Sequence, residues 1–557
     1  MPRVSFIGVL KAPRLPFCAL IAFLIAFTVL AWNIDRDGIA APYVDPIAHT
    51  RTQDEALHVN SAMHMARDGG WLTPEFMGRL LLFKPPLLIW LTALSIRILG
   101  LSLFVVRLPA LFAGAAGIAA VFLWCARAGS VAAGALAASF LLLTPFWQIL
   151  SRLCLTDVPA AAFATLALAA VAFDPRFERA RTPVAFGALG AASILAKSVA
   201  GDLPFAALAM YYLLSPRESR PPLARVALAF LVAAAVASPW HIYQAWIHPQ
   251  WFWADYVQVQ LFGVGLHSQA ATLFDRSLMF YLGRLARMDP VLCIFALGGV
   301  VGAMRIARLR RQPAALLAFC SAVAAILALC VFQRKHLPYI VFLLPSLCVL
   351  GALCGPAILR RPVVVASLVL VLFGAKTIAH GNPWSLRPAT PPMEAAKALR
   401  EYYRLGRDVE LISVEGDDEF YSAVLPLPRV RYGLLDPAGT AARAVPHYAQ
   451  LGIVLSADQF THLPTLLPGF ENSLRQWGVD SPEPVGSLIL LRVPSEVAAI
   501  VRSRPGSDFY LPSGWEGSDS SVTQTHEVVR SSNNRIFLLS RAAPRRQQPI
   551  PAIPARW

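Results

Sequence analysis

The sequence has little charge for its length. Of its 557 residues only 15% are charged, and the 33 acidic residues are fewer than the 49 basic ones. Hydrophobic residues make up 56% of the chain, and its mean hydropathy is +0.55. This composition excludes an ordinary soluble protein and is typical of a polytopic membrane protein.

The sequence also lacks the cysteine spacings of disulfide scaffolds and metal sites. None of its eight Cys residues falls in the polar C-terminal third, and they show neither CxxC nor Cys/His spacing. Each lies in or beside an apolar stretch, which favours small, buried, apolar side chains over a disulfide framework. We therefore predict no metal-binding residues from this pattern.

The net charge of +16 does not indicate a nucleic-acid partner. The Arg residues stand in short clusters between apolar blocks, where they act first as topology signals. At the N-terminus, Arg3, Lys11 and Arg14 precede the apolar run PFCALIAFLIAFTVLAW. No small-x-small cleavage site follows directly, so an uncleaved first helix is favoured over a signal peptide.

Apolar blocks of bilayer-spanning character fill the chain as far as about residue 380. The twelve candidates are 17–33, 84–99, 104–126, 129–149, 155–173, 183–198, 202–214, 224–244, 288–305, 313–331, 337–354 and 362–379. The positive-inside rule places the Arg-bearing connections in the cytoplasm. The connections that then face outward are 34–83, 150–156, 199–201, 241–287 and 332–336.

One block breaks this alternation of sides. If both 84–99 and 104–126 crossed the membrane, Arg127 and every later Arg cluster would lie on the wrong side. We therefore predict that the block after Lys84 lies in the outer interface without crossing, which leaves about eleven crossings. The overall range is 11–13 transmembrane helices in a domain spanning residues 1–380, with outer loops at 34–83 and 241–287.

The remainder of the chain has a different composition. Four β-rich runs, DVELISVEG, LGIVLSA, GSLILLRV and NRIFLLS, and a helical pattern near 391–405 predict a mixed α/β domain over residues 385–540. The Pro- and Arg-rich end, 541–557, is predicted to be a disordered tail. The predicted topology places the α/β domain outside.

Acids, cations and His gather on the outward side of this scheme. They are Asp54, Glu55, Lys84, Arg152, Asp157, Lys197, Asp202, His241, His267, Arg334, Lys335 and His336. Each has a structural alternative: Asp54 and Glu55 begin an amphipathic helix, Lys84 and Lys197 suit snorkelling, and Asp157 suits a helix cap. Their concentration on one face favours a functional site.

Taken in order, these motifs resemble a known enzyme family. The Asp-Glu pair is followed by GGWLTPEFMGRLLLFKPPLLIWLTAL, RLPALFAG, SRLCLTDVPAAAF, ILAKSVAG, SPW and QRKHLPYIVFLLPSL, over roughly residues 50–355. This order resembles the aminoarabinose transferase and protein mannosyltransferase group of C-type membrane glycosyltransferases. The resemblance implies a bacterial inner-membrane enzyme whose active site and C-terminal α/β domain are periplasmic.

The resemblance also implies roles for individual residues. Asp54, Glu55 and Asp157 match acidic catalytic positions, and Asp54 matches the key first-loop acid. Lys84 matches the donor-phosphate site, and Lys197, Lys335 and His336 are similar to cationic positions of the family. Arg152 is a further outward cation placed to bind the donor phosphate. The implied co-substrate is a sugar linked to polyprenyl (undecaprenyl) phosphate. No other cofactor is implied, and metal dependence stays open.

Two departures bear on the substrate. Phe83 precedes Lys84 where aminoarabinose-type members often have Glu, and 241–287 lacks an evident Glu-His pair. The predicted function is sugar transfer to lipid A or a related envelope glycolipid. The alternatives are a protein O-mannosyltransferase and, from another class, a lipid or solute transporter, which would carry charges midway through its spans.

For either transfer, the main task is to stabilise the charge of the departing lipid phosphate. A protein Ser or Thr acceptor requires a general base, which would be Asp54. A lipid A phosphate is already largely ionised, because its second pKa is about 6. In that case Asp54 would orient the sugar, the acceptor or a cation. Single displacement with inversion is expected for both acceptors.

Overall fold

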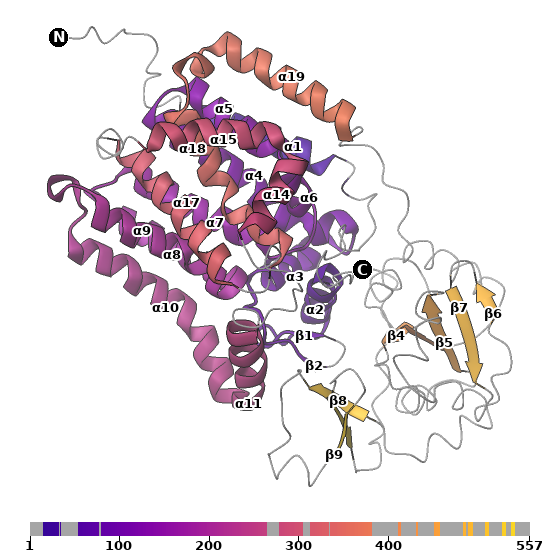
Figure 1. Ribbon diagram of the computed structural model, residues 1–557. Coiled ribbons are helices and arrows are strands. Elements are labelled where there is room, and N and C mark those ends of the chain that lie inside the picture. Colours follow the sequence, from indigo (N-terminus) through magenta and orange to yellow (C-terminus); the bar gives the residue numbers. More distant parts are fainter. Residues whose placement is uncertain are drawn as a thin grey trace, which may run out of the picture.

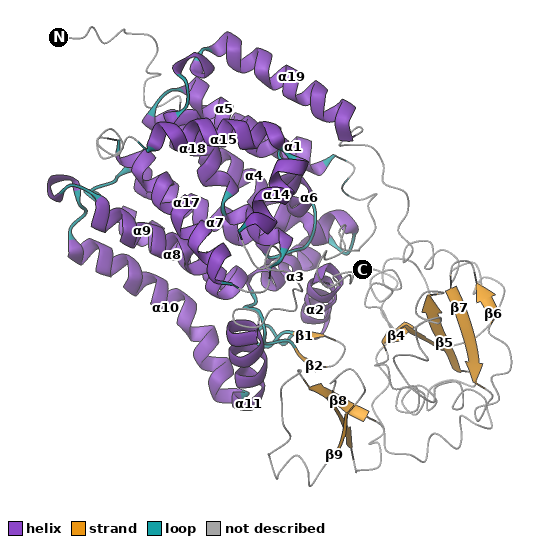
Figure 2. Ribbon diagram, in the orientation of Figure 1, coloured by secondary structure: helices purple, strands orange, loops and turns teal. Residues whose placement is uncertain are grey.

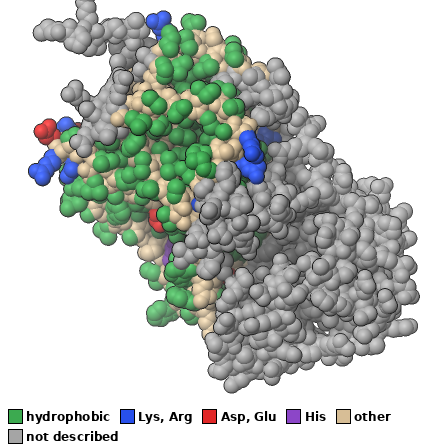
Figure 3. Space-filling model, in the orientation of Figure 1, with side chains coloured by type: hydrophobic (Ala, Val, Ile, Leu, Met, Phe, Trp, Pro, Cys, Tyr) green, Lys and Arg blue, Asp and Glu red, His purple; other side chains and the backbone are tan. Residues whose placement is uncertain are grey.

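The computed structural model shows a helical body with one short β-hairpin (Figures 1 and 2). It describes residues 15–32, 34, 54–76, 79–263, 278–304, 312–332 and 335–380, together with eight strand segments between residues 410 and 540. Figure 3 shows that apolar side chains cover most of the visible face of the helical part, as expected for a surface that meets lipid tails.

Helices account for nearly all of the body. The α-helices are α1 (Leu15–Ala31), α2 (Asp54–Asp68), α3 (Leu87–Leu99), α4 (Leu103–Ala128), α5 (Val131–Leu143), α6 (Pro145–Ser151), α7 (Asp157–Phe173), α8 (Arg181–Lys197), α9 (Leu203–Leu214), α10 (Leu223–Ile247), α11 (Pro249–Trp251), α14 (Met279–Met288), α15 (Pro290–Ala303), α17 (Pro313–Val331), α18 (Leu344–Cys354) and α19 (Pro362–His380). Four 3₁₀ segments are η2 (Ser198–Asp202), η3 (Arg217–Ser219), η5 (Leu337–Phe342) and η6 (Ala357–Arg360). A π-helix, η4, covers Phe252–Gly263. All twelve predicted apolar blocks are helical.

The block at 129–149 is broken rather than straight. Its two helices, α5 and α6, meet at an angle of 69°. The break lies at Thr144 and Pro145, because Pro has no N–H and disfavours helical backbone at the residue before it. Thr144 accordingly has an extended conformation, and its hydroxyl donates a hydrogen bond to the carbonyl of Phe140 at 2.7 Å.

Five helical stretches of the described chain are long and apolar enough to cross a membrane, or six if the bent pair is one span. They are Leu103–Ala128, Arg181–Leu214, Leu223–Ile247, Pro313–Val331 and Leu337–Cys354. This count is below the predicted eleven or so crossings for two reasons. Helices α1, α7 and α15 have 14–17 residues, and α19 is counted only as the shorter helix Pro362–Val371. In addition, α8 and α9 are counted together in Arg181–Leu214. A perpendicular crossing takes about 20 residues, so the full number of crossings stays a prediction.

The stretch Arg181–Leu214 folds back on itself at η2. The rings of Phe186 in α8 and Phe205 in α9 are 5.2 Å apart, although 19 positions separate them. Gly201 permits the turn, since a Cβ there would lie 2.4 Å from backbone atoms of Ser193 and Ile194. The predicted outward connection at 199–201 is therefore this tight corner.

The first outer loop contains α2 and a short hairpin whose two strands have two residues each, and α3 follows it. Strands β1 (Glu75–Phe76) and β2 (Arg79–Leu80) pair antiparallel. Helix α2 ends at Gly69 and Gly70, which adopt positive φ values of 92° and 62°. Helix α3 has 13 residues, about 20 Å at 1.5 Å per residue, which is shorter than a 30 Å hydrocarbon core. Helices α9 and α15, with 12 and 14 residues, are similarly short, so the prediction that the block after Lys84 does not cross stays a prediction.

The predicted outer loop at 241–287 contains more helix than expected. Helix α10 continues to Ile247, and α11, η4 and α14 follow it. The Trp residues of this region are not uniformly interfacial. Trp240 is 3% exposed, whereas Trp246 is 82% exposed. Trp240 is therefore packed inside the body, whereas Trp246 lies on its surface.

The four predicted β-rich runs each contain a strand. The eight strands are β3 (Glu410–Ser413), β4 (Val430–Tyr432), β5 (Leu451–Ser456), β6 (Glu483–Val485), β7 (Leu488–Val493), β8 (Ser507–Leu511), β9 (His526–Arg530) and β10 (Ile536–Ser540). They form a mixed sheet of order β4-β3-β5-β7-β6 and an antiparallel sheet of order β8-β10-β9. The helical pattern near 391–405 and the tail at 541–557 lie outside the described residues, and the α/β domain stays a prediction.

Candidate active site

Segments from all five predicted outward connections meet at one end of the helical body. Residues of the first outer loop contact the 150–156 connection, since the backbone N–H of Cys154 donates to Glu55 Oε1 at 2.9 Å. Residues following α10 contact the η2 corner, and residues following α17 contact Lys197, as described below. These contacts bring the connections close to one another, and the side of the membrane on which they lie stays a prediction.

A buried ion pair joins two of the predicted site residues. Lys197, the last residue of α8, places Nζ 2.6 Å from Oδ1 of Asp157, the first residue of α7, and their side chains are 6% and 5% exposed. The same Nζ lies 5.1 Å from the ring centroid of Tyr339, on which the ring of His336 stacks at 5.5 Å. The structure thus brings Asp157, Lys197 and His336 together around Tyr339.

Lys84 lies in a second part of the site. Its side chain is 8% exposed, and Nζ is 5.3 Å from the ring centroid of Phe83. Two residues earlier, the backbone N–H of Leu82 donates a hydrogen bond to the carboxylate of Asp255 in η4. Burial raises the pKa of Asp255 to about 7, against the lowering effect of that hydrogen bond. An acid that the sequence analysis did not identify therefore stands beside the Lys84 loop.

The π-helix connects these two parts. Asp255 contacts the Lys84 loop, and its neighbour Tyr256 accepts a hydrogen bond of 2.9 Å from Ser198, which follows Lys197. Tyr256 OH also lies 2.8 Å from Nε2 of His241. The sequence analysis placed His241 on this side but missed Tyr256 and Ser198. The available signal was a cluster of aromatic and polar residues in SPWHIYQAWIHPQWFWADY.

Glu55 occupies a closed structural pair. Arg107 of α4 donates from Nε and Nη2 to the two carboxylate oxygens of Glu55 at 2.8 and 2.9 Å, and both side chains are fully buried. Arg107 Nη1 donates to the carbonyl of Ile34 at 2.7 Å. With the Cys154 N–H as well, these groups satisfy one another, so the geometry gives Glu55 a structural role, and its predicted catalytic role stays a prediction.

Two predicted phosphate-binding cations instead contact carbonyls at helix ends. Arg152 Nη1 donates to the carbonyls of Leu30 and Trp32 at the end of α1, at 3.2 and 2.7 Å. Lys335 Nζ donates to the carbonyls of Leu329 and Phe332 at the end of α17. Helix C-termini carry partial negative charge, which cations stabilise. Burial lowers the pKa of Lys335.

Other predicted residues are described in part or not at all. Asp54 begins α2, immediately before Glu55, but its side chain lies outside the described residues. His267 and Arg334 also lie outside them. Among the residues that the structure describes, no three His, Cys, Asp or Glu side chains are grouped to hold a metal ion.

The first outer loop is fixed to α10 through one carbonyl. Trp240 Nε1 and Gln244 Nε2 both donate to the carbonyl of Leu72, at 2.9 and 2.6 Å. Trp90 Nε1 donates to the neighbouring carbonyl of Trp71. These contacts hold the segment before the Lys84 loop against the helix that carries His241.

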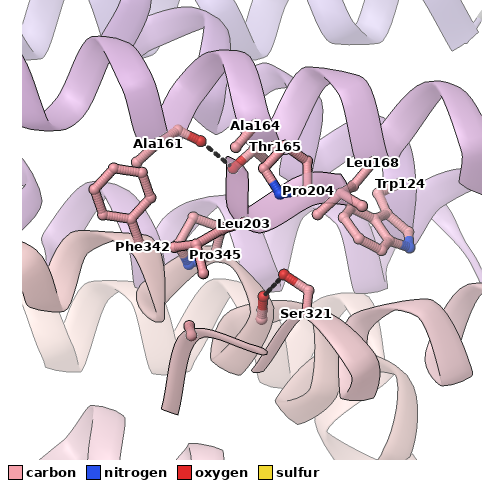
Figure 4. A pocket seen from close by; sticks show the side chains of 12 residues that line it. Trp124, Ala161, Ala164, Thr165, Leu168, Leu203, Pro204, Ser321, Phe342 and Pro345 are labelled. Carbon is pink, nitrogen blue, oxygen red and sulfur yellow. Dashed lines mark hydrogen bonds between the residues drawn. The ribbon is translucent and has the colours of Figure 1, made fainter. Parts of the chain in front are cut away.

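A small cavity lies inside the body beyond the ion pair. It encloses about 10 Å³, room for about one water molecule, and its walls come from α4, α7, α9, α17, η5 and α18 (Figure 4). Three hydroxyls face it: Thr165 bonds to the carbonyl of Ala161, and Ser346 donates to Ser321 at 2.7 Å. It is too small for a sugar or a lipid chain.

Comparisons with known proteins agree with the sequence resemblance. Residues 83–243 match the family described as Dolichyl-phosphate-mannose-protein mannosyltransferase. The chain is 29% identical over 322 residues to the undecaprenyl phosphate-alpha-4-amino-4-deoxy-L-arabinose arabinosyl transferase of Pseudomonas aeruginosa. It is also 29% identical over 324 residues to the transferase of that name from Pseudomonas paraeruginosa. In both cases the match covers 55% of this chain and 55% of the relative, so the chain spans about half the length of these relatives.

The fold has a solved counterpart. The crystal structure of ArnT from Cupriavidus metallidurans bound to undecaprenyl phosphate superposes with a TM-score of 0.61 at 18% identity, covering 87% of this chain and 98% of that one. The protein is therefore a polytopic helical membrane protein with the ArnT-like, C-type glycosyltransferase fold. The predicted resemblance to membrane glycosyltransferases is confirmed.

Proposed function

We propose that the protein is an integral membrane glycosyltransferase that uses a polyprenyl-phosphate-linked sugar as donor. The carrying observation is the buried pair of Lys197 and Asp157, connected through Ser198, Tyr256 and Asp255 to the loop of Lys84. Two lysines at one end of the body suit a lipid phosphate whose headgroup lies at the membrane surface. The fold and the family match support the same class.

In the proposed reaction, an acceptor oxygen attacks the anomeric carbon of the donor sugar. The new C–O bond forms as the bond from that carbon to the phosphate oxygen breaks, and polyprenyl phosphate leaves with the electron pair. Lys84 and Lys197 stabilise the negative charge that develops on the phosphate, a contribution of the kind that dominates many enzymes. In the present geometry the carboxylate of Asp157 contacts the ammonium group of Lys197, so the donor phosphate competes with this carboxylate for the ammonium group.

We propose Asp54 as the acid nearest the acceptor, because it begins α2 directly before Glu55. With a hydroxyl acceptor it takes the proton as general base. With a phosphate acceptor it orients the reactants, since the nucleophile is already ionised. His336 extends the donor side through Tyr339. The structural contacts of Arg152, Lys335 and Glu55 favour supporting roles over direct ones.

The leading acceptor is lipid A or a related envelope glycolipid, on the periplasmic face of the bacterial inner membrane. The names of the matched relatives support a sugar donor linked to undecaprenyl phosphate, over about half of each chain, and the choice of lipid A as acceptor rests on the sequence resemblance. A protein hydroxyl is the second candidate, because the matched family is described as a protein mannosyltransferase. Phe83, in place of an acid before Lys84, bears on this choice.

The placement of charge favours an enzyme over a transporter. Asp157 begins α7, Lys197 ends α8 and Arg107 lies in the second turn of α4. Transport sites typically lie near the bilayer midplane, whereas these charges stand at helix ends. The geometry therefore supports chemistry at a surface.

The test is a transfer assay on the purified full-length protein. It is incubated with polyprenyl phosphate carrying aminoarabinose, hexosamine, uronic acid or neutral hexose, with lipid A and Ser/Thr peptides as separate acceptors, and products are detected by mass. Transfer to lipid A supports the leading acceptor, and transfer to peptide alone supports the second. Absence of transfer from every donor would contradict the proposed function.

A further inference from the structure

We infer that Ser198, Tyr256 and His241 form a positioning network that fixes Lys197 in the site. Nothing in the resemblance assigns these three residues a role. They come from η2, η4 and α10, three elements that meet beside the ion pair of Lys197 and Asp157. Their part in transfer rests on the proposed function, whereas their hold on Lys197 does not.

The donor and acceptor of each hydrogen bond in the network follow from the contact of His241 with the carbonyl of Ala237. His241 Nδ1 lies 2.8 Å from the carbonyl of Ala237, which can only accept, so Nδ1 carries the proton. In the neutral ring Nε2 then accepts, and Tyr256 OH must donate to it across 2.8 Å. Tyr256 oxygen in turn accepts from Ser198 Oγ at 2.9 Å. Every donor thus has one defined acceptor.

Burial keeps this arrangement in one protonation state. Burial raises the pKa of Tyr256 to about 12, against the hydrogen bond from Ser198, and the nearby carboxylate of Asp202 adds to the rise. The phenol therefore keeps its proton at neutral pH and remains the donor to His241.

The backbone of Ser198 supports a role for its side chain. Ser198 has φ 51° and ψ −136°, a conformation that residues with a Cβ rarely adopt. Glycine would adopt it without strain. A Ser at this position is therefore explained by its hydroxyl, which bonds Tyr256 and holds the corner directly after Lys197.

This network fixes where the ammonium group of Lys197 can lie. Lys197 leaves α8 as the chain enters the corner, and Nζ reaches Asp157 on one side and the Tyr339 ring on another. If the corner relaxes, the Cα of Lys197 shifts and these two contacts change together. Ser198, Tyr256 and His241 are therefore positioning residues, which act through Lys197.

The experiment compares Ser198→Gly, Ser198→Ala and Tyr256→Phe in the full chain in detergent. The matched control is Tyr211→Phe, which removes the hydroxyl of another buried Tyr, near the far end of α9. The first readout is the rate at which acetic anhydride acylates Lys197, measured by peptide mass spectrometry. The second is Tm, and the third is kcat and KM in the transfer assay.

Acylation of Lys197 should be slow in the wild type and severalfold faster in Ser198→Gly and Tyr256→Phe, but unchanged in Tyr211→Phe. Ser198→Gly should keep or raise Tm because strain is relieved, while Ser198→Ala lowers it. In an active enzyme, kcat should fall about tenfold to a hundredfold in the network variants, with the acceptor KM unchanged.

Wild-type acylation of Lys197 in folded Ser198→Gly and Tyr256→Phe would overturn the inference. Equal acceleration in Tyr211→Phe would also overturn it, because the effect would then be general loosening. If the wild type transfers no sugar, the proposed function fails, yet the acylation rates still decide whether the network holds Lys197.

Discussion

Two buried ion pairs lie at the same end of this protein, and they differ in the geometry of their contacts. Arg107 meets Glu55 through two parallel hydrogen bonds, with backbone groups of Ile34 and Cys154 completing the set. Lys197 lies 2.6 Å from Asp157 at a strained corner and also faces the ring of Tyr339. The guanidinium of Arg107 is fixed in a planar fork on its carboxylate, whereas the ammonium group of Lys197 is a point charge on a flexible stem that can exchange partners. Burial of a charged pair therefore does not by itself identify a site.

The largest expected effect is on the closed pair. Arg107→Ala should lower the free energy of unfolding by about 3–5 kcal/mol, because it leaves the Glu55 carboxylate buried and unpaired. Thermal unfolding in detergent measures the loss. The matched control is Arg67→Ala, which breaks a pair with the half-exposed Asp68 and should cost less than about 1 kcal/mol. Equal losses would show that Arg107 and Glu55 are not the structural pair.

The next effect separates a site cation from a helix cap. Lys197→Ala should lower turnover about 10²–10³-fold, equivalent to about 2.7–4 kcal/mol, because leaving-group charge loses a donor. Arg152→Ala should instead lower Tm and keep turnover, since its guanidinium bonds the end of α1. Initial rates with saturating donor measure both. A large loss of turnover in folded Arg152→Ala would restore its predicted phosphate role.

A smaller effect is a pH dependence from Asp255. Its pKa is raised from 3.8 to about 7, so the folded state binds this proton more tightly than the unfolded state does. Stability should therefore fall as pH rises from about 4 to about 7, by on the order of 1–2 kcal/mol after allowance for partial exposure. Asp255→Asn should reduce this fall in a series of Tm measurements. An identical pH profile in the variant would contradict the assignment.

The smallest effect concerns the loop before Lys84. Trp240→Phe removes one of the donors to the Leu72 carbonyl and should cost about 1 kcal/mol, because Gln244 still donates to the same oxygen. The control is Trp246→Phe, at a side chain that is 82% exposed, where Tm should not change. A larger loss at Trp246 than at Trp240 would show that the loop contact contributes nothing.

Much of the helical body follows from the sequence because composition alone fixes which segments avoid water. All twelve apolar blocks contain helices, and the connections that were predicted to share a side contact one another through Glu55, Ser198 and His336. Lys84, Asp157 and Lys197 were also predictable as site candidates, because charge near apolar segments is costly. The pairing of Asp157 with Lys197 was not predictable.

The unpredicted features depend on which segments meet. A cation that binds a phosphate and one that caps a helix look alike in sequence. The contacts of Arg152 and Lys335 with carbonyls at the ends of α1 and α17 therefore become apparent only in the structure. Asp255 and Tyr256 fall in a region read as a loop, where a π-helix aims them at different partners. Arg107 could have been predicted to have a buried acidic partner, because it is an arginine inside an apolar block.

The two hydrogen bonds from α10 to the Leu72 carbonyl have a consequence for the order in which parts of the protein form during synthesis. Their donors, Trp240 and Gln244, lie 168 and 172 positions later in the chain. At 5–20 residues per second, ribosomes reach them roughly 10–30 s after Leu72. In the predicted topology, the segment that carries Lys84 is outside during that interval, before the helix that donates these hydrogen bonds has been made. The contacts that hold the segment before Lys84 therefore form only after α10 has been made, and η4 and η5, which carry other residues of the site, are made later still.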